Sequence, residues 1–207
     1  MTNGPGTGES APAEPSARPI STVRYIAYVC IIIASAVMIY LLTVRELRNF
    51  LVPTNSMLPT FQPTDYIYTM NAKQYERGDV VVLEDPLERG AYVVKRIVAL
   101  GGDTVNIRWG ALYRNGEYVS EPYTLEPMIY DFPARNAGLV FTVPPGEVFV
   151  LGDNRNQSDD SSNWGSEQNL NHSVPASTIV GKVRGVYLPP RRIRSIEGFP
   201  NLTVPVP

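Results

Sequence analysis

Lysine is scarce in this chain, and one lysine stands in an unusual place for a charged side chain. Only three lysines occur among the 207 residues, at positions 73, 95 and 182. In the apolar run 91–100, strand alternation puts Lys95 on a face whose other members are alanine, valine and isoleucine. Burial there would disfavour the ammonium form and lower the pKa of Lys95, so that the neutral amine can become a general base near neutral pH. The alternative is a lysine at a sheet edge whose side chain reaches water.

A general base needs a nucleophile, and a serine held between prolines is one candidate. Pro53 and Pro59 bracket the segment that contains Thr54 and Ser56, and they fix its backbone. Such a turn can present the Ser56 hydroxyl beside an exposed backbone N–H, which attack on a carbonyl and stabilisation of the oxyanion both require. Thr54 offers a second donor through its hydroxyl. Taken alone, a serine between prolines is more often an ordinary loop residue.

A loop dense in short polar side chains, residues 152–165, follows the apolar run EVFVL. These side chains can hydrogen-bond the backbone and one another, so an ordered loop of this kind is able to hold a catalytic base in place. The alternatives are a solvated loop and a calcium loop, although the spacing does not match an EF-hand. His172 is the one histidine of the chain, and a lone histidine in a polar segment is a second candidate base or a surface residue.

An uncharged apolar run, residues 25–44, stands near the N-terminus. As a helix it would rise about 30 Å, the thickness of the hydrocarbon core of a bilayer. A buried core helix or a cleaved signal sequence would be the alternatives. The run lacks a polar face and Arg45-Glu46-Leu47-Arg48 follows it, so the sequence favours a membrane anchor. Residues 1–24 are rich in Pro, Gly, Ser and Ala and are expected to form a disordered tail.

The remainder of the chain is expected to be mainly β. Short runs rich in β-branched and aromatic residues alternate with clusters of Gly, Pro, Asn and Asp, and Asn115-Gly116 is a strong signal for a two-residue hairpin. We expect a β domain over residues 45–190 and a loosely ordered tail over residues 191–207. A net charge of −2 argues against nucleic-acid binding, and a single cysteine excludes a disulfide framework.

Several of these segments together resemble the bacterial type I signal peptidases, which carry a Ser–Lys dyad. The resemblance covers about residues 20–190 and rests on the order and spacing of four motifs. They are Asn-Ser-Met-Leu-Pro-Thr at 55–60, Arg-Gly-Asp-Val-Val at 77–81, Val-Lys-Arg-Ile-Val at 94–98 with Gly-Gly-Asp at 101–103, and Gly-Asp-Asn-Arg-x-x-Ser-x-Asp-Ser at 152–161. The fold implied is the antiparallel β domain of signal peptidases and LexA-like proteins, after one N-terminal transmembrane helix.

The resemblance implies a role for individual residues. Ser56 would be the nucleophile and Lys95 the general base, and the Ser56 backbone N–H and the Thr54 hydroxyl would form the oxyanion hole. Ser158 would orient the lysine. The positions that match structural support are Asp153, Arg155 and Asp160. The family often has an arginine directly after its Asp-Ser pair, whereas this chain has Ser162 there.

The resemblance also implies a substrate and a location. The substrate would be a secretory preprotein with small residues at positions −1 and −3 before the cut, bound extended along a sheet edge. The walls of its pockets would be formed by Pro53, Met57, Leu58, Val93 and Val94. Neither a metal nor an organic cofactor is implied. The helix would cross the cell (inner or plasma) membrane once, in contact with lipid, with the N-terminus in the cytoplasm and the catalytic domain on the trans side.

Two other functions compete with removal of signal peptides. One is a self-cleaving Ser–Lys repressor of the related fold, but such proteins carry an N-terminal DNA-binding domain where this chain has a polar tail and an apolar run. The other is a catalytically silent, membrane-anchored β module that binds exported peptides. The presence of both Ser56 and Lys95 favours the enzyme over the silent module.

Overall fold

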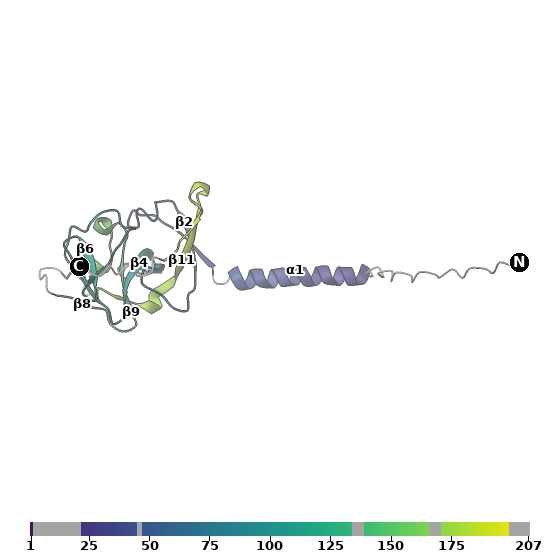
Figure 1. Cartoon of the computed structure of the whole chain (residues 1–207), viewed down its shortest axis with the longest axis horizontal. Coiled ribbons are helices and arrows are strands. Elements are labelled where there is room, and N and C mark those ends of the chain that lie inside the picture. The colour runs from purple at the N-terminus through teal and green to yellow at the C-terminus, as the bar shows by residue number, and fades with distance from the viewer. Residues whose placement is uncertain (2–21, 45–46, 134–138, 166–170, 199–207) are drawn as a thin grey trace. The chain divides into compact units, whose positions relative to one another are not determined.

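The computed structural model describes Met1 and residues 22–44, 47–133, 139–165 and 171–198 (Figure 1). The chain divides into two compact units, Met1–Val44 and Arg45–Pro207. The tail expected over residues 1–24 lies outside the described residues, except for Met1 and residues 22–24. Those last three residues belong to the first turn of a helix.

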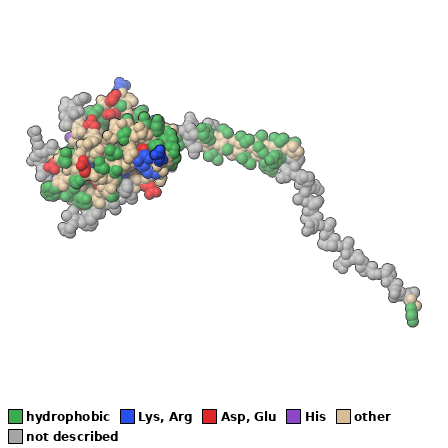
Figure 2. All heavy atoms as spheres, turned by 90° about the horizontal axis from the view of Figure 1, so that it is seen from above, with side chains coloured by type: hydrophobic (Ala, Val, Ile, Leu, Met, Phe, Trp, Pro, Cys, Tyr) green, Lys and Arg blue, Asp and Glu red, His purple; other side chains and the backbone are tan. Residues whose placement is uncertain are grey.

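Helix α1 spans Thr22–Val44, three residues longer at its start than the apolar run expected from the sequence. Its 23 residues rise about 35 Å. Within it, Thr22–Tyr40 is long and apolar enough to cross a bilayer, and none of that segment is buried against the protein. The visible face of α1 accordingly carries hydrophobic side chains (Figure 2). By length and composition, α1 is therefore a candidate membrane span.

The second unit is an antiparallel β domain, as expected from the sequence. Its larger sheet has the order β1-β2-β11-β3-β4-β9-β10, with β12 paired to β11, and its smaller sheet has the order β7-β6-β5-β8. The strands are β1 Leu47–Leu51, β2 Tyr66–Met70, β3 Val80–Glu84, β4 Tyr92–Leu100, β5 Thr104–Arg108, β6 Ala111–Arg114, β7 Glu117–Tyr118, β8 Phe141–Thr142, β9 Glu147–Leu151, β10 Val174–Pro175, β11 Ile179–Leu188 and β12 Arg194–Ser195. The helical turns are η1 Arg155–Gln157, α2 Ser161–Trp164, η2 Ala176–Thr178 and η3 Pro190–Arg192.

The hairpin expected at Asn115-Gly116 is confirmed. It joins β6 to β7, and both turn residues have positive φ, 54° and 81°. That pair of angles defines the turn type that suits the twist of two antiparallel strands, and asparagine and glycine adopt it at low cost. A second turn of this kind, Trp109-Gly110, joins β5 to β6 with φ values of 52° and 76°. Its tryptophan gave no hairpin signal in the sequence.

The central strands β3 and β4 are buried on both faces, and this sets the environment of the site. Along β3, Val80 and Val82 pack into one hydrophobic cluster, while Val81 and Leu83 pack into another on the opposite face. A third cluster joins the two sheets and includes Phe149 of β9. A strand with apolar packing on both faces gives a charged side chain no easy path to water.

Two sheet edges remain unpaired near the start of β4. Residues Tyr92–Lys95 pair with β3 on one side, and the pairing of β4 with β9 on the other side begins only at Arg96. Strand β1 pairs with β2 alone among the described strands. Both edges therefore retain backbone groups that can accept a further strand.

The C-terminal segment differs from the expectation of a loose tail over residues 191–207. Residues 190–198 contain η3 and β12, and β12 pairs with β11. The Arg192 guanidinium also binds Asp65 through two hydrogen bonds of 2.6 and 2.8 Å. A bidentate ion pair of this kind fixes the segment against the domain. Residues 199–207 lie outside the described residues.

The cluster between the two sheets predicts a specific loss of stability. Phe149 is fully buried there, with its ring centroid 5.2 Å from that of Phe132 and 5.7 Å from that of Phe141. We expect Phe149→Ala to lower the free energy of unfolding by about 3–5 kcal/mol, because it removes the ring and leaves a cavity. Urea denaturation would measure this change. Ile129→Ala is the control, since Ile129 is 86% exposed and its truncation should change stability by less than about 0.5 kcal/mol.

Candidate active site

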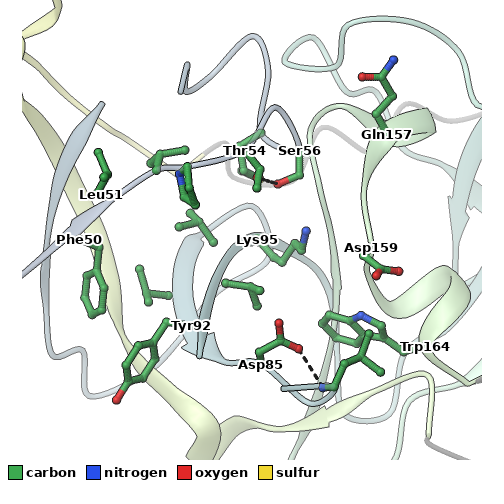
Figure 3. A pocket seen from close by; sticks show the side chains of 17 residues that line it. Phe50, Leu51, Thr54, Ser56, Asp85, Tyr92, Lys95, Gln157, Asp159 and Trp164 are labelled. Carbon is green, nitrogen blue, oxygen red and sulfur yellow. Dashed lines mark hydrogen bonds between the residues drawn. The ribbon is translucent and has the colours of Figure 1, made fainter. Parts of the chain in front are cut away.

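A cavity of about 350 Å³ lies between the unpaired edge of β1 and the unpaired start of β4 (Figure 3). Most of its lining is apolar, but it also contains the Ser56 hydroxyl and the Lys95 amine. The residues that line it are Phe50, Leu51, Val52, Pro53, Thr54, Ser56, Met57, Val82, Asp85, Leu87, Tyr92, Val93, Val94, Lys95, Gln157, Asp159 and Trp164. A serine and a lysine in one apolar cavity are the pair that the sequence predicted.

Backbone hydrogen bonds hold the segment that carries Ser56. Directly after β1, the Val52 N–H donates to Asp65 O and the Val52 carbonyl accepts from Thr64 N, both at 2.9 Å. Farther along, the Ser56 carbonyl accepts from Asn154 N at 3.0 Å, which joins this segment to the loop after β9. The buried Met57 side chain then anchors the turn in the core. Ser56 is therefore positioned by both the edge strand and the polar loop.

Lys95 is 3% exposed, although no carboxylate forms an ion pair with it in the described part of the chain. Its Nζ donates to Ser158 Oγ at 3.0 Å. Burial lowers the pKa of Lys95, and this effect outweighs the opposing attraction of nearby carboxylates, of which Asp160 contributes most. The structure thus favours a buried amine over the alternative of a lysine that reaches water.

Ser56 and Lys95 lie in the same cavity without a direct hydrogen bond between them. The Ser56 hydroxyl lies 3.1 Å from Thr54 Oγ1, as the dashed line in Figure 3 marks, and the Lys95 amine bonds Ser158. Catalytic hydrogen bonds are often long or absent without substrate and form only in the complex. Each group has one side-chain hydrogen-bond partner among the described residues, Thr54 for Ser56 and Ser158 for Lys95.

Close packing at Gly152 brings Ser158 near the nucleophile segment. A Cβ at this position would lie 2.2 Å from Ser158 Oγ and 2.5 Å from the Ser56 carbonyl oxygen, far inside contact distance. Only glycine therefore fits between these two groups. Gly152, at the start of the polar loop, therefore allows the Ser158 hydroxyl to lie close to the backbone of Ser56.

A buried ion pair lies behind the site, and sequence reasoning missed its arginine. Arg96 follows Lys95 on β4, points to the opposite face and is fully buried. Its Nε and Nη2 bind the two carboxylate oxygens of Asp153 at 2.8 and 2.6 Å, and its Cζ lies 3.9 Å from the Tyr123 ring centroid. Thr60 donates to the same carboxylate at 2.5 Å. Asp153 thus connects β4, the nucleophile segment and the polar loop.

Arg155 and Asp160 hold the polar loop at two other points. The buried Arg155 binds Glu121 through two hydrogen bonds of 2.5 and 2.7 Å and donates from Nε to Gly152 O at 2.8 Å. Asp160 accepts from Gly152 N at 2.9 Å and from the Ser162 hydroxyl at 2.8 Å. Ser162, which stands where the resemblance expected an arginine, therefore itself binds Asp160. The aspartate also caps α2 through the Ser162 backbone N–H.

Two residues that the sequence put forward as a pocket wall and as a second candidate base, Leu58 and His172, do not line the cavity. Leu58 was expected to form part of the pocket wall but does not line it, whereas Pro53, Met57, Val93 and Val94 do. His172 packs its ring 4.7 Å from the Phe132 centroid, and its Nδ1 lies 2.8 Å from the Ser161 carbonyl. Because His172 does not line the cavity that contains Ser56, its use as the base is not supported by the geometry.

Comparison with known proteins places this chain among the peptidases. The family model described as "Signal peptidase, peptidase S26" matches residues 23–188. A probable signal peptidase I-1 of Synechocystis sp. is 33% identical over 72% of this chain and 74% of its own length. Thylakoidal processing peptidase 1 of Arabidopsis thaliana is 36% identical over 69% of this chain, which spans 42% of that longer protein.

A crystal structure of a signal peptidase I from Enterococcus faecalis also matches, with 33% identity and a TM-score of 0.43 over 54% of this chain and 98% of that one. The class defined by these family and sequence matches is a serine peptidase. More specifically, the chain belongs to the signal peptidase family, peptidase S26. The resemblance found in the sequence is confirmed, and the family supports removal of signal peptides as the activity.

The buried pair behind the site predicts a large loss of stability on removal of one charge. Asp153→Asn leaves the Arg96 guanidinium buried without its counter-ion. We expect the free energy of unfolding to fall by about 3–5 kcal/mol, measured by urea denaturation in detergent. The matched control is Asp159→Asn, which neutralises an exposed carboxylate of the same loop and should cost less than about 0.5 kcal/mol. Equal stability of the two variants would contradict a supporting role for Asp153.

Proposed function

We propose that this chain is a membrane-anchored endopeptidase that removes N-terminal signal peptides from exported preproteins, with Ser56 as nucleophile and Lys95 as general base. The observation that carries this proposal is the burial of Lys95 in the cavity that contains Ser56. Burial lowers the pKa of Lys95 and so increases the neutral fraction of the amine at a given pH, and only a neutral amine can accept the serine proton. Family membership supports the overall activity, and the cavity supports the assignment of these two residues.

The reaction proceeds through an acyl-enzyme. Neutral Lys95 accepts the Ser56 hydroxyl proton as Oγ attacks the carbonyl carbon of residue −1. The oxyanion accepts hydrogen bonds from the Ser56 backbone N–H and the Thr54 hydroxyl, which lies beside Oγ. The Lys95 ammonium then donates its proton to the leaving amine as the peptide bond breaks. Neutral Lys95 then takes a proton from a water that attacks the acyl carbon, and it returns this proton to Ser56 Oγ as the bond to the signal peptide breaks. Ser158 orients the amine throughout.

The substrate binds as an added strand. An extended peptide placed between the free edge of Tyr92–Lys95 and the Phe50–Pro53 segment satisfies backbone groups on both sides. Met57, Val82 and Val94 pack on one face of this slot, and they leave room there for small apolar side chains at positions −1 and −3. No cofactor is required for this chemistry, because the amine itself transfers the proton.

Helix α1 has a functional role in this proposal. It crosses the cell membrane once and holds the enzyme in the bilayer that also holds the signal peptide. Sharing a bilayer raises the effective concentration of substrate without any further contact. The N-terminus lies in the cytoplasm and the β domain lies on the trans side, where exported preproteins emerge.

Removal of either member of the dyad tests the proposal directly. We expect Ser56→Ala and Lys95→Ala each to lower kcat/KM for a secretory preprotein by at least about a thousandfold, since each removes a group that acts with the other as a unit. Cleavage by purified protein in detergent, with the new N-terminus sequenced, would measure this. Circular dichroism of both variants should match that of the unaltered chain. Full activity in either folded variant excludes this dyad.

The dyad also predicts the direction of the pH dependence. Lys95 is active when neutral, and burial sets its pKa below the usual value of a lysine. Activity should therefore be low at acidic pH, rise as Lys95 loses its proton, and level off above the lowered pKa. Measurement of kcat/KM from pH 5 to pH 10 tests this. A profile that is flat through this range would exclude Lys95 as the base.

A further inference from the structure

The substrate cavity has two chemically different faces near the start of β4. Val94 belongs to the cluster that contains Met57 and Val82, whereas Val93 packs with Leu87 and Trp164 in the cluster on the opposite face of the strand. Figure 3 shows Phe50, Leu51 and Tyr92 on one side of the cavity and Asp85 and Trp164 on another. The first face is mainly apolar and carries no charged group, while the second contains a carboxylate.

The register of β3 and β4 assigns Asp85 to the face of Lys95. Val81 pairs with Lys95 and Leu83 pairs with Val93, and the Asp85 N–H donates to Ala91 O at 3.0 Å. Cross-strand partners point to the same side of a sheet, and alternate residues of one strand share a face. Asp85 therefore lies on the side of Val93 and Lys95, where it lines the cavity.

Among the described residues, no basic side chain forms a hydrogen bond or salt bridge with the Asp85 carboxylate, which acts on Lys95 only at longer range. One oxygen accepts the Leu87 N–H at 2.8 Å, a contact that fixes the side chain without neutralising it. Asp85, Lys95 and Asp159 are the charged residues that line the cavity, and Lys95 carries no charge when it acts as the base. In the active protonation state, the cavity wall is therefore negative on this face.

We propose that Asp85 determines specificity at substrate position −2, where it favours a basic side chain and disfavours an acidic one. This inference rests on the proposed function, because it assumes a preprotein in the slot between the two free edges. In an extended peptide, successive side chains point to opposite faces. Residues −1 and −3 enter the apolar face beside Met57 and Val94. Residue −2 then points to the face of Val93 and Asp85.

Three preproteins that differ only at position −2, as Lys, Gln or Glu, test this inference with the purified full chain in detergent. We expect kcat/KM to be highest for Lys and lowest for Glu, with a ratio of about tenfold at low salt, because attraction and repulsion at a partly exposed carboxylate each contribute about threefold. The ratio should shrink in concentrated salt, which screens such charges. Equal values for Lys and Glu, or a ratio independent of salt, would overturn the proposal.

Variants of the enzyme test whether the preference at substrate position −2 depends on Asp85. Asp85→Asn keeps an oxygen that can accept the Leu87 N–H but removes the charge, and we expect the Lys-to-Glu ratio to fall to about twofold or less. Glu84→Gln is the matched control, because Glu84 is the adjacent exposed acid and does not line the cavity. It should keep the tenfold ratio. If folded Asp85→Asn keeps the tenfold Lys-to-Glu ratio of kcat/KM, Asp85 does not determine the preference at position −2.

The experiment separates this inference from the proposed function. Failure of the function appears as no cleavage of any of the three preproteins, or as cleavage that survives in Ser56→Ala. Failure of the inference alone appears as Ser56-dependent cleavage of all three at the same kcat/KM. Because the ratio compares substrates on one enzyme at one pH, it is unaffected by any change that Asp85→Asn makes to the pKa of Lys95.

Discussion

The burial of one lysine is the constraint on which the site depends. An ammonium group in an apolar setting is strongly disfavoured, so a fold that buries Lys95 must surround it with groups that tolerate the neutral amine. Within the part of the chain that the structure describes, Lys95 donates to a neutral acceptor, the Ser158 hydroxyl, and forms no ion pair with a carboxylate. The nearby carboxylates act only from a distance. A direct ion pair would hold the proton on the lysine and abolish its use as a base.

Arg96, the next residue after Lys95, is also buried, but its charge is paired with a carboxylate. Arg96 is buried one residue later, on the other face of β4, but two oxygens of Asp153 neutralise it. A buried guanidinium stays charged in any environment, so the fold has to pair it. The same aspartate follows Gly152, whose lack of a side chain lets Ser158 approach the nucleophile segment. Strand β4 thus carries, on opposite faces, a paired structural charge at Arg96 and the amine of Lys95, which we propose as the general base.

Sequence reasoning succeeded where the signal was local. Each feature that was predicted correctly depends on a short stretch of consecutive residues. These features are the apolar alternation around Lys95, the Asn115-Gly116 turn and the apolar run of α1. The missed features depend on distant partners. Arg96 meets an aspartate 57 residues away, and Arg192 meets one 127 residues away, which orders a segment expected to be loose. The binding of Asp160 by Ser162 was missed for another reason, since the family pattern drew attention to the absent arginine rather than to the hydroxyl present.

The unpaired edges of the larger sheet explain why nucleophile and base come from different segments. If β9 paired with β4 along its whole length, Tyr92–Lys95 would have no backbone groups free for a substrate, and the cavity would close. The pairing instead begins directly after Lys95, so the proposed base lies at the point where the sheet opens. A peptide that occupies the opening has its backbone fixed on both sides, and each of its side chains meets a face already defined by β3 and β4. In the proposed mode of binding, selectivity at the cut follows from strand alternation: the face with Met57 and Val94 would limit side-chain size at positions −1 and −3, and the face with Asp85 would select charge at position −2.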